Sequence, residues 1–225
     1  MGRGTVGVAL GLVLLVPFAH AGEIPGAELI LRQEFRAFPG DVPEATPPQF
    51  VLLKDGVVFV GGSSRLAQGR LDASELKALD KDLARVRKLH ATGGSVVFGP
   101  GEMTLQLVVL KGRRFEIATS GDPATAPPGL APLAALVGRL ARFDHPSLRP
   151  YVPVAYALAA RPAARIGGCR AWSFPVSASD ATQRPREVPA SEAEGWPTGA
   201  RTAWACDGAN TYAVTLRPLL PGESP

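Results

Sequence analysis

Short apolar and alternating runs, separated by turn residues, dominate the first half of the chain. Residues 28–38 begin with an apolar run and predict a strand. Two more runs, 50–53 and 57–60, flank Lys54-Asp55-Gly56, and an Asp-Gly pair readily adopts the positive φ angles of a tight turn. A hairpin is therefore expected over residues 50–60. Strands are also expected at 95–98, 103–110 and 113–119, the last two joined as a second hairpin at Lys111-Gly112.

A helical period follows the first hairpin. Asp72 and Glu75 have the spacing of a capping box, and Leu71 and Leu76 occupy the positions of a hydrophobic staple. These signals predict a helix that begins at Asp72, runs for about four turns and ends before Gly93-Gly94. Its apolar stripe has spacings of three and four and consists of Leu76, Leu79, Leu83, Val86 and Leu89.

A second amphipathic helix is expected from Leu130 to Arg142. Apolar residues recur there with helical period, and Pro132 falls in the first turn, where a missing N–H group does little harm. Asp144-His145-Pro146 then ends the helix.

The last 75 residues differ in character from the rest. Alternating runs at 169–176, 202–206 and 211–216 predict strands, with a hairpin at Asp207-Gly208 and one helical turn over 191–194. Three tryptophans, Trp172, Trp196 and Trp204, are typical of the core of a small β unit; a sugar- or peptide-binding groove is the alternative.

Antiparallel hairpins rather than βαβ units account for the order of these elements. The expected class is α+β: a two-layer sandwich of two amphipathic helices on an antiparallel sheet, followed by a smaller β-rich part. We expect a signal peptide at 1–21, an α+β domain at 22–148 and the β-rich part at 149–225, with the boundary near Pro146 to Pro153.

The N-terminal residues have the composition of a secretory signal peptide. Arg3 is their only charge, an apolar run extends from Thr5 to Phe18, and small residues at Ala19 and Ala21 predict cleavage after Ala21. The run is short against the ~20 residues that a membrane anchor needs. Residue 22 is glycine rather than cysteine, which argues against a lipid anchor. We therefore expect a soluble periplasmic or secreted bacterial protein, without a membrane span after signal removal.

Two cysteines, Cys169 and Cys206, lie in the exported part. Oxidising compartments turn such pairs into disulfides, and the wide spacing lacks the CxxC arrangement of redox-active thiols. A single structural disulfide is expected.

The charge of the chain argues against nucleic acid as a partner. The formal net charge is only +4. The densest basic stretches, 85–88 and 111–114, lack the interleaved aromatic residues that stack on bases, and are typical of solvated surface.

Candidate chemistry is sparse. The exported part has two histidines, and His90 is expected to interact with the end of the first helix. Asp144, His145 and Ser147 place an acid, an imidazole and a hydroxyl close in sequence, but a turn that satisfies backbone groups is the favoured interpretation. The sequence has no GxSxG elbow, HExxH motif or GxxxxGK[ST] loop. No catalytic residue, metal or cofactor is assigned.

The order of elements from Glu28 to Leu140 carries a resemblance. A strand, the Asp55-Gly56 turn, Gly61-Gly62, Gly69-Arg70-Leu71 leading into the capped helix, a hairpin and a leucine-rich helix are similar to uncharacterised exported bacterial domains. The pattern also resembles a small family of protein inhibitors of thermolysin-type metalloproteases. The resemblance covers about half of the chain and implies no catalytic residues.

The sequence therefore favours a non-catalytic exported protein that binds another envelope or extracellular protein. A hydrolase that uses Asp144 and His145, and an inhibitor of a metalloprotease, are the alternatives.

Overall fold

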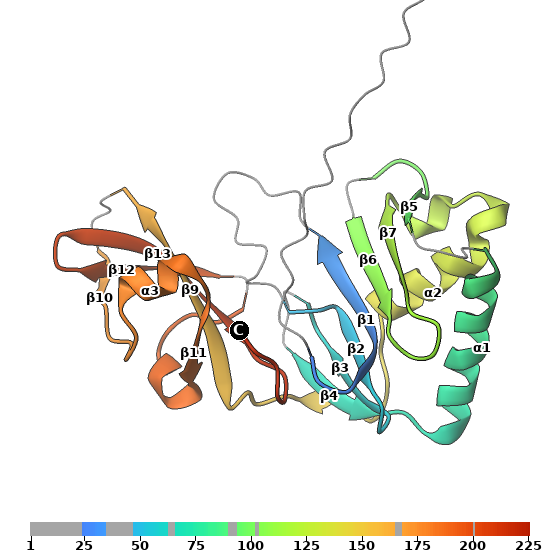
Figure 1. Ribbon diagram of the computed structural model, residues 1–225, viewed down its shortest axis with the longest axis horizontal. Helices are drawn as coiled ribbons and strands as arrows, with labels where there is room; N and C mark the ends of the chain where they lie inside the picture. Colours follow the sequence, from blue (N-terminus) through green and yellow to red (C-terminus); the bar gives the residue numbers. More distant parts are fainter. Residues whose placement is uncertain are drawn as a thin grey trace, which may run out of the picture.

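The computed structural model describes residues 24–34, 47–62, 66–89, 94–101, 104–164, 168–199 and 201–225. It contains two sheets, and the two longer helices lie on the side of the larger sheet that faces away from the smaller one (Figure 1). Within these ranges no helix is both long and apolar enough to cross a membrane. The predicted cleavage site at Ala21 and the predicted helix contact of His90 lie outside the described residues.

The larger sheet contains eight strands within the described ranges, in the order β5-β7-β6-β1-β2-β3-β4-β8. Their bounds are β1 Ala27–Glu34, β2 Phe50–Leu53, β3 Val57–Val60, β4 Ala67–Arg70, β5 Gly94–Val97, β6 Thr104–Val109, β7 Phe115–Ser120 and β8 Arg149–Pro150. All neighbours are antiparallel except β5, which pairs in parallel with β7.

Local signals produce the hairpin of β2 and β3. Gly56 has a φ of 83°, a conformation that glycine adopts without steric cost, and its N–H group donates to the carbonyl of Leu53. The predicted hairpin is confirmed, with Phe50 opposite Val60. The following strand, β4, was not expected from the sequence.

Helix α1 (Ala73–Leu89) begins with the predicted capping box. Asp72 Oδ1 accepts the Glu75 N–H at 2.9 Å, and Glu75 Oε2 accepts the Asp72 N–H at 2.8 Å. Helix α2 (Ala131–Ala141) has Pro132 in its first turn, and the short 3₁₀ segments η2 (Pro123–Thr125) and η3 (Pro128–Leu130) precede it.

One face of the larger sheet packs against both helices. Leu79, Leu83 and Val86 of α1 and Leu133 and Leu136 of α2 share one buried cluster with side chains of β1, β2, β6 and β7. The opposite face has its own buried cluster, which includes Ile30, Val51 and Phe59 together with Leu220 from the segment after the last strand. This sheet is therefore apolar on both faces.

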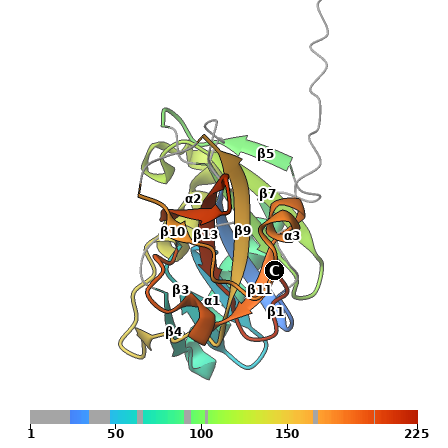
Figure 2. The same cartoon turned by 90° about the vertical axis from the view of Figure 1, so that its left-hand side faces the viewer.

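The smaller sheet contains five strands within the described ranges, in the order β10-β12-β13-β9-β11. Their bounds are β9 Ala155–Ala163, β10 Arg170–Ala171, β11 Arg186–Pro189, β12 Thr202–Asp207 and β13 Asn210–Pro218. The hairpin of β12 and β13 at Asp207-Gly208 is confirmed. Figure 2 shows this sheet in front of the larger one.

Helix α3 (Ala178–Gln183) and the 3₁₀ segment η4 (Ala190–Ala193) cover one face of the smaller sheet. Phe174 and Trp196 pack there against Leu158 and Val214. The strand expected over 169–176 is wrong beyond its first residues, since only β10 pairs; the chain then leaves the sheet toward α3.

The α+β class and the disulfide are confirmed. Cys169 and Cys206 are bonded, with Cα atoms 5.6 Å apart, and the bond links the residue before β10 to β12. The expected burial of all three tryptophans is wrong for Trp204, which is 39% exposed. Side chains alternate along a strand, and the neighbouring Ala203 and Ala205 take the core side of β12.

Candidate functional site

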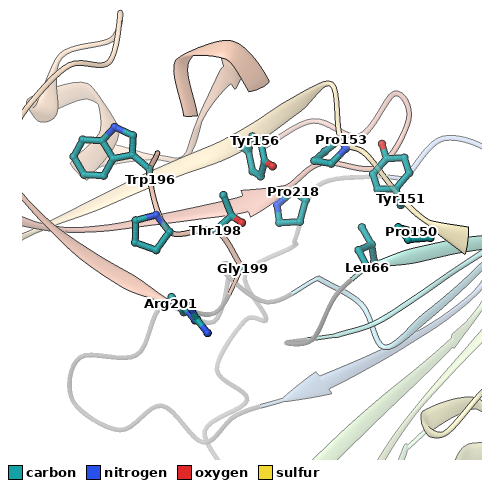
Figure 3. A pocket seen from close by; sticks show the side chains of 11 residues that line it. Leu66, Pro150, Tyr151, Pro153, Tyr156, Trp196, Thr198, Gly199, Arg201 and Pro218 are labelled. Carbon is teal, nitrogen blue, oxygen red and sulfur yellow. The ribbon is translucent and has the colours of Figure 1, made fainter. Parts of the chain in front are cut away.

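A cleft of about 600 Å³ lies where the two sheets are joined. Leu66 and Pro150 come from the larger sheet and its edge, Tyr151, Pro153 and Tyr156 from the connection into β9 and its start, and a second group from the smaller sheet and its loops. That group is Trp196, Pro197, Thr198, Gly199, Arg201 and Pro218. Figure 3 shows Trp196 at one end of the cleft, Leu66 and Pro150 at the other, and Tyr156 between them.

Trp196 is held firmly as one wall of the cleft. The backbone N–H of Trp196 donates to the carbonyl of Ala193 at 3.0 Å, and the backbone N–H of Gly199 donates to the carbonyl of Leu216 on β13 at 2.8 Å. The indole packs on Phe174 with ring centroids 4.7 Å apart, and the guanidinium of Arg170 lies 4.6 Å from the indole centre. The loop that presents Pro197 and Thr198 is thus fixed on both sides of its tip.

Two tyrosines form the middle of the cleft. The Tyr151 hydroxyl donates to the Leu219 carbonyl at 3.0 Å, and its ring meets Phe59 edge-on at 5.2 Å. Burial raises the pKa of Tyr151, and the nearby Glu223 charge raises it further. Burial also raises the pKa of Tyr156, against the opposing effect of its hydrogen bond with Thr198. Both phenols therefore stay neutral at physiological pH.

The lining of the cleft is mainly apolar and aromatic. Three aromatic rings and four prolines supply rigid apolar surface, and hydroxyl groups supply a few polar contacts. Among the described residues of the lining, Arg201 is the one whose side chain is charged at neutral pH. The described residues that line this cleft include neither a carboxylate nor an imidazole.

A second cavity of about 590 Å³ lies beside α2. It is lined by alanine, proline and glycine residues of α2, of η2 and of the residue after η2, and by Arg139 and Arg142. Arg139 is already paired with Asp82 at 2.7 Å. This hollow has no convergent polar groups and resembles an ordinary groove beside a helix.

The structure brings His145 into a hydrogen-bonded cluster. Its Nε2 atom lies 2.7 Å from Glu75 Oε1, and its Nδ1 atom lies 2.7 Å from Ser147 Oγ. The carboxylate partner is therefore Glu75 at the start of α1, whereas Asp144 is exposed. The ring of Phe143 also stacks on the imidazole, with centroids 6.1 Å apart.

Ser147 already serves the backbone of β4. Its hydroxyl oxygen accepts the Arg70 N–H at 3.0 Å and lies 3.1 Å from the Arg70 carbonyl, to which it can donate. The Ser147 N–H in turn points to His145 Nδ1 at 3.2 Å. The expected turn that satisfies backbone groups is thus present, and the cluster joins α1, β4 and residues 145–147. His145 lines neither of the two cavities.

Residue pattern alone could not locate the cleft. Tyr151 and Pro153 fall in the predicted boundary segment, and Pro218 follows the last predicted strand. Of the three tryptophans for which the sequence offers a groove as the alternative, Trp196 alone lines the cleft. In the described ranges no group of three His, Cys, Asp or Glu side chains is placed to hold a metal ion.

Comparisons with known proteins add no relative. No protein-family model matches the chain, and no curated protein or solved structure is significantly similar to it. Function must therefore be argued from the site.

Proposed function

We propose that this protein is exported and binds an extended, proline-containing segment of another extracytoplasmic protein. The observation that carries the proposal is the lining of the cleft, which combines Tyr151, Tyr156 and the largely buried Trp196 with four prolines. Proline-rich segments adopt a preformed extended helix without internal hydrogen bonds, and aromatic-lined grooves recognise it at low entropic cost. A volume of about 600 Å³ lies within the range of ligand sites.

The positive charge of Arg201 restricts which proline-containing segments should bind. Arg201 is exposed and stands at the end of the cleft beside Gly199 (Figure 3). A guanidinium pairs well with a carboxylate in bidentate geometry. The partner segment should therefore carry an acidic residue close to its prolines.

The disulfide supports the proposed compartment. A bond between Cys169, just before β10, and Cys206 on β12 persists in oxidising surroundings, which agrees with export to a periplasm or the exterior. In this proposal the helices and the larger sheet form a two-layer scaffold, and the smaller disulfide-bonded sheet completes the cleft.

The test is selection from a library of ten-residue peptides that share a Pro-x-x-Pro core. The oxidised protein, residues 22–225, should enrich peptides with an acidic flank and bind them with saturable anisotropy. Tyr156→Ala should weaken this binding at least tenfold, equivalent to about 1.4 kcal/mol. Arg201→Gln should weaken acidic peptides but not their glutamine counterparts.

The matched control is Val152→Ala. Val152 lies between Tyr151 and Pro153 in the connection from β8 to β9, is 80% exposed and does not line the cleft. It should bind like the unmodified protein. Absence of enrichment, or equal affinity in Tyr156→Ala, would remove the proposal.

A hydrolase is the second candidate, because His145 bridges a carboxylate and a hydroxyl. It requires turnover of an ester such as p-nitrophenyl acetate that disappears in His145→Ala and persists in Asp144→Ala. Equal turnover in all three proteins would exclude His145 as a catalytic residue. The binding proposal expects that result, since Ser147 is already engaged with Arg70.

A further inference from the structure

Four polar side chains on β1, on β13 and in the segment after β13 are buried or, in the case of Arg32, half-buried. Arg32 lies on β1, Thr215 and Arg217 lie on β13, and Glu223 lies in the segment after β13. Thr215, Arg217 and Glu223 are between 3% and 6% exposed. These four residues, the interlayer cluster, come from three separate parts of the chain. They do not line the aromatic cleft.

One ion pair in the interlayer cluster is complete. Arg217 Nη1 donates to Glu223 Oε1 at 2.7 Å, and the Leu220 N–H donates to Glu223 Oε2 at 3.0 Å. Both carboxylate oxygens are therefore in use. This carboxylate balances a single guanidinium.

Three polar atoms of the cluster have no hydrogen-bond partner in the described part of the chain. Arg32 Nε, Arg217 Nε and Thr215 Oγ1 are buried and make no hydrogen bond within the described part of the chain. Nor does any described carboxylate form an ion pair with Arg32. Buried polar groups in proteins are nearly always paired, and each exception calls for an explanation.

The electrostatics of Arg32 agree with an uncompensated charge. Burial lowers the pKa of Arg32, Glu223 raises it and the neighbouring Arg217 charge lowers it further. Glu116 also favours the charged form, but its carboxylate is exposed and accepts a hydrogen bond from Gln106. Glu223 is thus paired with Arg217, and Arg32 feels the charges of both without an ion pair of its own among the described residues.

We propose that the interlayer cluster is a binding site for a small oxyanion, a carboxylate or a phosphate, held between the two sheets. Arginine Nε–H groups only donate, and a threonine hydroxyl can donate as well, so the missing partner must accept hydrogen bonds. A negative charge is required because the cluster carries a positive excess. An oxyanion meets both needs, and guanidinium groups recognise it well. It would link β1 to β13 and so strengthen the contact between the sheets.

The test is thermal unfolding of the oxidised protein, residues 22–225, in Hepes at constant ionic strength. Inorganic phosphate and acetate are titrated from 0.1 to 50 mM as probes, with chloride as the reference anion. A ligand that binds only the native state raises the Tm with its concentration. We expect such a rise with at least one oxyanion, and at least a tenfold weaker response in Arg32→Gln and in Thr215→Val.

The control variant is Arg113→Gln, which removes an exposed arginine in the turn between β6 and β7. It should respond like the unmodified protein. A Tm that does not respond to either oxyanion, or that rises equally in Arg32→Gln, would overturn the site and leave only a general salt effect.

Folding of the variants is itself informative. Without oxyanion, Arg32→Gln and Thr215→Val should be at least as stable as the unmodified protein, because each removes an unpaired buried group. A large loss of stability in both variants under these conditions would contradict the proposal. Arg217 is left intact because its removal would strand Glu223.

Discussion

Glu75 serves two structures with one carboxylate. Its Oε2 atom accepts the backbone N–H of Asp72 and completes the capping box of α1, while Oε1 meets His145. The beginning of the helix is thereby fixed to the turn that follows α2. The sequence indicates Glu75 only as part of a local capping box, but its carboxylate also contacts His145, which lies 70 positions further along the chain.

Asp72 makes this helix start sensitive to acid. The hydrogen bond from the Glu75 backbone, and then that from the Ser74 hydroxyl, lower the pKa of Asp72. A carboxylate with a lower pKa in the folded state stabilises the protein above its unfolded pKa, about 3.9, and loses that effect as pH falls through the folded pKa. Asp72→Ala should therefore be less stable than the unmodified protein at pH 7, with a smaller difference at pH 2. Urea unfolding at both pH values measures this, with Asp144→Ala as an unaffected control. A difference independent of pH would contradict it.

At the scale of elements, the approach of β4 to residues 147–148 depends on Gly69. A Cβ atom at Gly69 would lie 2.6 Å from Ser147 Oγ and 3.1 Å from Leu148 Cδ2. Gly69→Ala should destabilise the protein by about 1–3 kcal/mol, the usual cost of overpacking. Gly129→Ala is the control, since no atom lies within 4 Å of its added Cβ. Equal urea midpoints for the two variants would contradict this prediction, because they would show that β4 can move away from residues 147–148 at no cost in stability.

Elements with local signals were predictable, and those that depend on distant partners were not. The Asp55-Gly56 turn, the capping box of α1 and the periodicity of α2 lie within short windows. Strand β9 is rich in alanine and contains Pro162, so its own residues disfavour a strand. The segment is extended because it pairs with β11 and β13. The parallel pairing of β5 with β7 is likewise non-local.

The candidate site follows the same division. The sequence pointed to Asp144 as the neighbour of His145, but folding supplies Glu75 from another element. The cleft gathers Leu66, Tyr156 and Trp196 across 130 positions of the chain, and no local pattern marks that convergence.

For the whole molecule, the disulfide is the covalent link within the smaller sheet. Cys169 and Cys206 are 37 positions apart, and closing such a loop stabilises a fold by about 4 kcal/mol in the chain-entropy model. The double variant Cys169→Ser, Cys206→Ser should lose about that much in urea unfolding. Alkylation without reductant should leave the mass of the native protein unchanged. Two alkylated thiols, or equal unfolding midpoints, would contradict a stabilising bond.

The segment after β13 completes both sheets at once. Leu219 packs with Ala155 and Ala157 on the smaller sheet, and Leu220 joins the cluster on the larger one. Synthesis proceeds from the N-terminus, so a chain to which Leu220 has not yet been added leaves that face of the larger sheet without this cover. Truncated chains that lack Leu220 would therefore expose apolar surface of the larger sheet. Such surface is what quality-control proteases recognise, so truncated chains should be degraded faster than the full-length protein.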